Sequence, residues 1–212
     1  VFSRFEDFPR IQQVADLNLQ AGIKAKESMA YQAASTYLQA GLTLVGPTAW
    51  QEAYRLTLAC HEAAAEAAYL SGQFESMDGF INEILAQTRV PLDQVRSYDI
   101  RIQALASQGK LQDAIAVGIE ILNTLGVQLP PHPTQAEGQA ALHQLNQLMA
   151  DWSKPDLLAL PSMADPGAMA SVQILAGIGA ASYVSGSSLL PLILLKILEL
   201  SLQFGNTGSS TI

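Results

Sequence analysis

The strongest constraint on the fold of this chain is a pattern that occurs twice, 37 residues apart. Residues 71–85 read SGQFESMDGFINEIL and residues 108–122 read QGKLQDAIAVGIEIL, and the two stretches align on Gly72 and Gly109. In both, apolar or small residues follow the glycine at steps of three and four, which places them on one face of an α-helix.

An earlier copy lies 43 residues upstream of the first, within YQAASTYLQAGLTLVGP, and lacks the glycine. The shared helix face is made of Tyr31, Ala34, Leu38, Gly41 and Leu42, then Phe74, Met77, Ile81, Ile84 and Leu85, then Leu111, Ala114, Gly118, Ile121 and Leu122. The sequence therefore predicts one structural unit written three times.

Each later copy is preceded by a second helical stretch. Residues 91–108 have apolar residues at steps of three and four and begin with Pro91, which suits a first helical turn. Residues 50–70 follow Thr48 and Gln51, which have the spacing of a capping box. The predicted unit is thus a helix, a tight turn at the glycine, a second helix and a turn often marked by proline.

Helix pairs with a period near 34 residues are typical of tetratricopeptide solenoids, in which three copies are about the minimum for a stable stack. We therefore expect an all-α fold: a right-handed, tetratricopeptide-like helical-hairpin solenoid with degenerate repeats. Residues 11–128 form three helix pairs in this interpretation, and residues 1–212 form a single solenoid. The alternative is an irregular helical bundle whose internal similarity is accidental.

A proline-rich joint at 129–134 follows the repeats, and we expect further helical hairpins over 135–212. A capping box at Thr134 and Glu137 opens a helix that runs to about Trp152. Asp165 and Pro166 supply the cap and first turn of the next helix, to about Tyr183. The last helix begins at Ser187 or Ser188 and runs to about Phe204, before a Gly-Asn pair suited to a left-handed ending.

No charged residue occurs from Pro166 to Leu195, a stretch long enough to cross a bilayer. The segment VSGSS at 184–188 divides it, and Lys196 and Glu199 interrupt the apolar run that follows. We expect two helices buried in a soluble stack, with no membrane association. The opening residues VFSRFEDFPR carry charges where a secretory signal is apolar. The single Cys60 rules out an internal disulfide, and we expect a cytoplasmic location.

The composition limits the classes of partner and cofactor. Ala, Leu and Gln dominate, which favours helices. The formal net charge is −8 and the chain has no cluster of Lys or Arg, so we expect no nucleic-acid partner. No Cys and His residues have metal-ligand spacing, and we expect no metal or other cofactor.

Four stretches together are similar to a known kind of protein region: LNLQAGIKAKESMAYQAASTYLQAGLTLV, LTLACHEAAAEAAYLSGQFESMD, AIAVGIEILNTLGVQLP and LSLQFGNT. They resemble, in matching order from about Leu17 to Thr207, the helical-repeat region of large bacterial, often cyanobacterial, multi-domain signalling kinases. In those proteins a Ser/Thr kinase-like domain and a predicted ATPase precede this region, and sensor and histidine kinase domains follow it. The resemblance implies a non-catalytic scaffold between an ATPase switch and output domains.

The adjacent Cys60 and His61 are the nearest thing to a nucleophile and its base. Neighbouring helical residues point about 100° apart, so we expect a packed Cys and a partly exposed His instead. The glycines at 177–182 follow no strand, so we expect close helix packing there and no phosphate-binding loop.

A stripe of polar residues is the better candidate site. Glu62, Glu66 and Tyr69 share one face of the second repeat's first helix, and the equivalent third-repeat positions include Asp99 and Gln103. With Arg96 one turn before Asp99, these residues form a candidate protein-binding stripe suited to a basic or mixed-charge partner. The alternative is an ordinary solvated helix face.

We therefore expect a non-enzymatic interaction module within a signal-transduction kinase. A stand-alone peptide-binding adaptor is the second hypothesis. The third is an enzyme with its active site near residues 130–165, where titratable groups are scattered.

Overall fold

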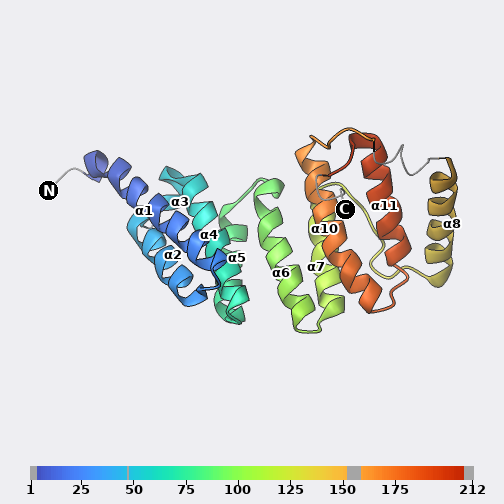
Figure 1. The fold of residues 1–212 in the computed structure, drawn as a ribbon, viewed down its shortest axis with the longest axis horizontal. Helices are drawn as coiled ribbons and strands as arrows, with labels where there is room; N and C mark the ends of the chain where they lie inside the picture. The colour runs from blue at the N-terminus through green and yellow to red at the C-terminus, as the bar shows by residue number, and fades with distance from the viewer. Residues whose placement is uncertain (1–3, 47, 152–158, 208–212) are drawn as a thin grey trace. The chain divides into compact units, whose positions relative to one another are not determined.

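The structure is a computed structural model that describes residues 4–46, 48–151 and 159–207 (Figure 1). These residues form helices and short connections, with no β-strand among them beyond one isolated bridge between Ser162 and Asn206, so the all-α prediction is confirmed. The helices are α1 (Arg4–Glu27), α2 (Tyr31–Val45), α3 (Ala49–Glu52), α4 (Tyr54–Leu70), α5 (Phe74–Gln87), the 3₁₀ helix η1 (Pro91–Gln94), α6 (Val95–Ser107), α7 (Leu111–Thr124), α8 (Gln135–Asp151), α10 (Pro166–Val184) and α11 (Leu190–Phe204).

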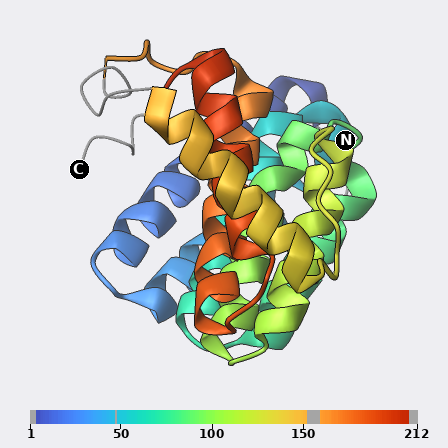
Figure 2. The same ribbon diagram turned by 90° about the vertical axis from the view of Figure 1, so that its right-hand side faces the viewer.

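The chain divides into two compact units, residues 1–100 and 101–212, with the boundary inside α6. In the first unit α1 packs on α2, and α4 contacts α1, α2 and α5. In the second unit α10 lies between α7 and α11, and α8 covers α11 (Figure 2).

The turns that precede α2, α5 and α7 have the same backbone geometry. Gly72 and Gly109 both have φ of 75°, and Met29, at the equivalent place in the earliest copy, has φ of 59°. The residues that follow them, Ala30, Gln73 and Lys110, have φ of −88°, −89° and −83° and ψ of 62°, 66° and 59°. The same type of turn therefore joins α1 to α2, α4 to α5 and α6 to α7.

The hydrogen bonds of these turns also match. The amide N–H of Ala30, Gln73 and Lys110 donates to the carbonyl five residues earlier, over 2.8, 2.8 and 2.9 Å. The positive-φ residue before each donates to the carbonyl three residues earlier, over 2.9, 2.9 and 3.0 Å. This pair of bonds is the Schellman motif, which satisfies the last carbonyls of a helix.

The helices after these turns bury the same positions. In α2, α5 and α7 the first residue of the repeated face is half-buried, and the third, seventh and tenth positions after it are buried. The buried residues are Ala34, Leu38 and Gly41; Met77, Ile81 and Ile84; and Ala114, Gly118 and Ile121. The helix face predicted from the repeat is thus the face that enters the core.

The predicted continuous helix over residues 50–70 is wrong, because it is interrupted near its start. The structure has a short helix, α3, then a break at Ala53 with φ of −141° and ψ of 44°, and only then α4. Thr48 makes no side-chain cap bond to the backbone; its hydroxyl donates to the Glu52 carboxylate over 2.8 Å. The capping box with Gln51 therefore does not form.

The predicted starts of α8 and α10 are confirmed, whereas α11 begins at Leu190, later than the predicted Ser187 or Ser188. Thr134 and Glu137 form a reciprocal capping box: the Thr134 N–H donates to the Glu137 carboxylate over 2.7 Å, and the Glu137 N–H donates to the Thr134 hydroxyl over 3.2 Å. The Asp165 side chain caps α10 by accepting from the Ala168 N–H over 2.7 Å. Trp152, the predicted end of α8, lies outside the described residues.

The last helix is followed by Gly205, whose φ is 97°. Its ψ of −178° differs from the left-handed helical ending expected from the sequence. The backbone is instead extended after the helix, because Asn206 donates to the Pro161 carbonyl over 2.7 Å and Met163 donates to the Asn206 carbonyl over 2.7 Å. This pair of bonds ties the end of α11 to the connection before α10.

Among the described helices, α10 alone is long and apolar enough to cross a membrane, and half of its apolar stretch is buried within the protein. The predicted break in this stretch is present, because α10 ends at Val184 and α11 begins at Leu190. The glycines of α10 lie close to neighbouring helices: a Cβ on Gly177 would be 3.6 Å from Ile102, and one on Gly179 would be 3.5 Å from Ile193. The expectation of close helix packing at these glycines is confirmed.

Candidate functional site

The predicted stripe residues lie on α4 and α6, but they are not equally exposed. Glu62, Glu66 and Tyr69 are half-buried on α4. On α6, Arg96 is half-buried, and Gln103 is exposed two turns further along. Asp99 has only 6% of its surface exposed, so the expectation of an exposed residue is wrong at this position.

Glu66 is the centre of an ion-pair network within the first unit. Its carboxylate accepts from the Lys26 ammonium of α1 over 2.5 Å and from the Arg96 guanidinium over 2.8 Å. Arg96 also donates to the Asp99 carboxylate over 3.1 Å. The network therefore joins α1, α4 and α6, and it places Glu66 between two cations.

Burial and ion pairing shift the pKa values of Glu66 and Arg96 in opposite directions. Burial by itself would raise the pKa of Glu66, but hydrogen bonds from Lys26 and Arg96 outweigh it and lower the pKa below its usual value. Burial by itself would lower the pKa of Arg96. The hydrogen bond to Glu66 and the charges of the nearby carboxylates outweigh it, so the pKa of Arg96 is raised. Both groups are thus held in their charged forms.

Glu62 differs from Glu66, although it lies one turn earlier on the same helix. Burial raises the pKa of Glu62 to about 7, against a lowering effect of the Arg96 charge, while Asp93 raises it further. Arg96 does not form an ion pair with it, because its guanidinium binds Glu66 and Asp99. Glu62 therefore exchanges protons near neutral pH, in contrast to Glu66.

A second cluster lies at the start of α4. The Tyr54 hydroxyl donates to the Asp93 carboxylate over 2.6 Å, and Arg55 donates to the other oxygen over 2.9 Å. Burial and the bond to Asp93 raise the pKa of Tyr54 to about 12. The side chain of Asp93 is only 10% exposed, whereas that of Arg55 is 81% exposed. Asp93 thus fixes η1 against α4.

Cys60 and His61 are arranged as expected for structural residues. Cys60 is fully buried among apolar residues, and burial raises the pKa of its thiol to about 11. The Nδ1 of His61 lies 2.8 Å from the Thr57 carbonyl and donates to it, and the imidazole packs against Trp50 with ring centres 5.0 Å apart. Burial lowers the pKa of His61, so it is neutral near pH 7. A thiol held in its protonated form is a poor nucleophile.

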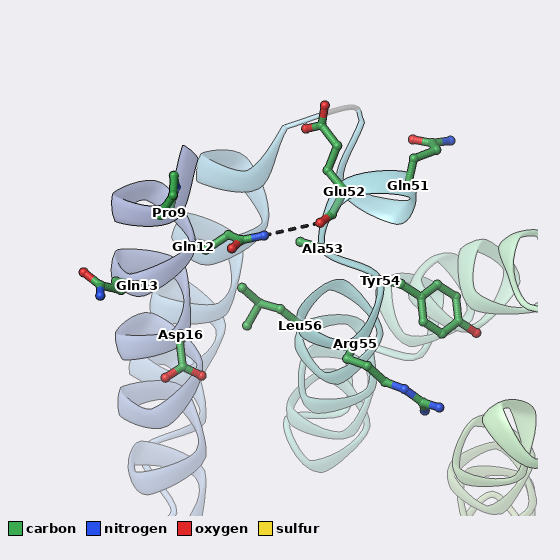
Figure 3. A pocket seen from close by; sticks show the side chains of 10 residues that line it. All are labelled: Pro9, Gln12, Gln13, Asp16, Gln51, Glu52, Ala53, Tyr54, Arg55 and Leu56. Carbon is green, nitrogen blue, oxygen red and sulfur yellow. Dashed lines mark hydrogen bonds between the residues drawn. The ribbon is translucent and has the colours of Figure 1, made fainter. Parts of the chain in front are cut away.

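A groove opens between α1 and the break at Ala53, with a volume of about 730 Å³ (Figure 3). Leu56 extends toward α1 from the start of α4, and Gln12 reaches across to donate to the Glu52 carbonyl over 3.3 Å. Tyr54 and Arg55 point away from α1. Both side chains bind Asp93 instead. The remaining lining residues are polar apart from Pro9 and Ala53: Gln13, Asp16, Gln51 and Glu52.

Sequence reasoning found part of this polar surface and missed the rest. The helical spacing placed Glu62 and Glu66 on one face, but nothing in the spacing identified Lys26, which pairs with Glu66 across 40 residues of sequence. The groove was missed because it depends on the break at Ala53, where no Gly or Pro interrupts the helical pattern.

Among the described residues, no group of three His, Cys, Asp or Glu side chains is placed to hold a metal ion. The region near 130–165 includes residues 152–158, which lie outside the described part of the chain. In the described part of this region, the carboxylates of Glu137 and Asp165 both serve as helix caps.

No protein-family model, curated protein or solved structure matches this chain. The resemblance to the helical region of signalling kinases therefore stays a prediction.

Proposed function

We propose that this chain is a non-catalytic interaction module built as a tetratricopeptide-like, right-handed solenoid. The observation that carries the proposal is the recurrence of one turn, with the same dihedral angles and hydrogen bonds, at Met29, Gly72 and Gly109. Repeated helix hairpins bury one face against their neighbours and leave the first helix of each pair with a surface for partners.

The polar surface of α4 supports an interaction role for the first unit. Glu62 is half-buried and protonates near neutral pH, and the groove beside α1 is lined by amide and carboxyl groups. Protein surfaces that bind other proteins combine such polar groups with apolar anchors, and Leu56 supplies an apolar floor here.

We further propose that the module belongs to a cytoplasmic bacterial signal-transduction kinase and lies between an ATPase switch and output domains. The resemblance of four stretches from Leu17 to Thr207, in matching order, supports this placement. In such a protein the module would contribute geometry and binding, and a partner would shift the switch only by binding one of its states more tightly. Its partners would be neighbouring domains or other proteins.

The reading frame around residues 1–212 tests the placement. Sequencing the intact gene should reveal a nucleotide-binding domain before this region and a kinase or sensor domain after it. An open reading frame that holds only this region would contradict the kinase placement and favour the second candidate, a stand-alone peptide-binding adaptor. The groove beside α1 is the observation that favours the adaptor.

The repeat architecture has its own test, independent of the gene. Because each solenoid repeat contacts only its neighbours, removal of a terminal repeat leaves the others folded. A chain that begins at Ala49 should keep a cooperative unfolding transition in circular dichroism. Complete loss of helical signal would contradict a repeat architecture.

A further inference from the structure

Two large apolar side chains of α1 are exposed and lie one turn apart on the same face of the helix. Val14 is 46% exposed and Leu17 is 62% exposed. Ala21, one further turn along, is half-buried. Positions 14, 17 and 21 follow the three- and four-residue spacing of a single helix face. We call these three residues the outer stripe of α1.

The second hairpin shows what happens to the same positions when a neighbouring hairpin is present. Because the turns that end α1 and α4 are equivalent, each position of α1 corresponds to the position 43 residues later on α4. Val14 and Leu17 therefore correspond to Thr57 and Cys60, which are only 1% and 0% exposed. The positions that are exposed on α1 are thus core positions on α4.

The first hairpin is what buries these positions of α4. Cys60 shares a core cluster with Ala34 and Leu38 of α2. A Cβ on Gly41 of α2 would lie 3.8 Å from the Cys60 Sγ, which is ordinary van der Waals contact. The outer stripe of α1 is therefore the surface on which a further helix would pack in the way that α2 packs on α4. A repeat that closes a stack has a polar outer face, and the outer stripe is apolar.

Cations flank the outer stripe at both ends. Arg10 and Lys24 continue its three- and four-residue spacing, and both side chains are exposed. They are 14 residues apart in sequence, or about 21 Å along the helix axis. The exposed carboxylate of Asp16 lies on the adjacent face of α1, which lines the groove.

The two cations disfavour a second copy of this chain as the occupant of the outer stripe. Antiparallel pairing of two copies of α1 about Leu17 would place Arg10 of one copy against Lys24 of the other. Parallel pairing would place each cation against its own equivalent. Like charges repel in both arrangements, whereas a helix with carboxylates near both ends would be attracted.

We propose that the outer stripe of α1 binds an amphipathic helix of a partner protein, with an apolar seam and a carboxylate near each end of the seam. The seam covers Val14, Leu17 and Ala21 as α2 covers α4, and the carboxylates pair with Arg10 and Lys24. Recognition of one helix by another uses apolar anchors at three- and four-residue spacing, which the outer stripe provides. This inference rests on the proposed interaction function and names the chemistry of the partner.

Nuclear magnetic resonance titration of residues 1–212 with synthetic helices tests the proposal. The acidic probe is a peptide of about 18 residues, or five helical turns, with a seam of Leu and a Glu near each end of the seam. The Lys probe replaces both Glu residues with Lys, and the Ser probe replaces the Leu seam with Ser. The acidic probe should shift the amide resonances of residues 10–24, and the Ser probe should not. The Lys probe should bind at least about threefold more weakly than the acidic probe.

Two matched double variants assign the binding to α1. Val14→Thr with Leu17→Gln removes the apolar anchors, so the dissociation constant of the acidic probe should rise by about tenfold or more. The control is Leu142→Gln with Leu194→Gln, on α8 and α11, where the two side chains are 46% and 43% exposed. This control should leave the dissociation constant unchanged. Circular dichroism checks that both variants are folded.

A third double variant, Arg10→Gln with Lys24→Gln, tests the charges separately from the apolar seam. It should bind the acidic probe and the Lys probe about equally, because no cation then remains at either end of the outer stripe. Added salt should reduce the preference of the original chain for the acidic probe in the same way, since both cations are exposed.

Four results would overturn the assignment. The acidic probe could leave the resonances of α1 unshifted, the Lys probe could bind as tightly, or the variant at Val14 and Leu17 could bind unchanged. The fourth is a dimer of residues 1–212 in sedimentation that dissociates in this variant, which would assign the outer stripe to a second copy. If the probes fail to bind while a chain that begins at Ala49 still folds, the docking surface is lost and the repeat module stands. The two failures are therefore distinguishable.

Discussion

The two units of the chain each have a central helix rich in small residues, and the two helices use them differently. In the first unit α4 buries a run of alanines, yet it keeps Glu62 and Glu66 along one edge. In the second unit α10 has no charged residue and buries apolar side chains around most of its circumference. Both helices use small residues for close packing, but only α4 combines them with charged residues along one edge. We therefore propose a binding role for α4 and a structural role for α10.

The largest expected effect concerns the packing of α7 on α10. A Cβ at Gly118 would lie 2.1 Å from Cγ2 of Ile178, whose side chain is fully buried. Gly118→Ala should therefore destabilise the second unit by about 2–3 kcal/mol, as overpacked cores do. Chemical denaturation followed by circular dichroism measures the loss.

Gly79 is the matched control for this substitution, since it is also a helical glycine. A Cβ there would meet nothing within 4 Å, so Gly79→Ala should stabilise the protein by up to about 1 kcal/mol through helix propensity. Equal effects of the two substitutions would show that α7 and α10 are not closely packed.

The next effect concerns the ion pairs of α4. Glu66→Gln leaves Lys26 and Arg96 without their shared carboxylate, and the three side chains are 17%, 40% and 22% exposed for Lys26, Arg96 and Glu66. We expect a loss of about 1–2 kcal/mol, less than for a fully buried pair. Glu75→Gln, an exposed carboxylate on α5, is the control and should change stability little. Similar values for the two variants would mean that the network does not join α1, α4 and α6.

The pH dependence of this loss has a defined sign. The folded pKa of Glu66 is lowered, so its contribution is present above the unfolded pKa of about 4.3 and disappears as the pH falls through the folded pKa. The stability difference between Glu66→Gln and the original chain should therefore shrink in acid. A difference that stays constant from pH 7 to pH 3 would contradict the ion pairing.

Glu62 should show the opposite pH dependence. Its folded pKa of about 7 lies above the unfolded value, so the folded state holds the proton and stability falls as pH rises from about 4.3 to about 7. Glu62→Gln removes this dependence and should stabilise the protein at pH 8 by about 1–2 kcal/mol, after allowance for partial exposure. Parallel denaturation curves at pH 5 and pH 8 measure it. Equal stability of the variant and the original at pH 8 would contradict the desolvation of Glu62.

The smallest effect distinguishes the first hairpin turn from the later ones. Met29 has φ of 59° and is 77% exposed, so it bears left-handed strain without a compensating contact of its side chain. Met29→Gly should stabilise the first unit by up to about 1 kcal/mol, and Gly72→Ala should cost about the same. Thermal unfolding of both variants provides the measurement. A destabilised Met29→Gly variant would show that this turn is not equivalent to the others.

The repeated elements could be predicted from the sequence because their causes are local. Gly72 and Gly109 fix the turns, and the spacing of apolar residues fixes the buried face of the helices that follow. The caps at Thr134 and Asp165 are also local, because each side chain binds the backbone N–H of the residue three positions later. The turn at Met29 has no glycine, and only the buried face of the helix that follows it could be predicted.

The break at Ala53 could not be predicted, because the residues on either side of it form hydrogen bonds with residues that are distant in sequence. Glu52 accepts from Gln12, and Tyr54 donates to Asp93, at separations of 40 and 39 residues. The burial of Asp99 has the same origin as the network around Glu66, in which side chains from three helices meet. Sequence spacing identifies a helix face, but it does not show which neighbour covers that face.

An experimental structure of residues 1–212 tests the central claim, that three copies of one hairpin stack in a regular series. The rotation and translation that superpose α1–α2 on α4–α5 should also superpose α4–α5 on α6–α7. Two unrelated transformations would contradict the solenoid and leave three similar turns within an irregular helical bundle.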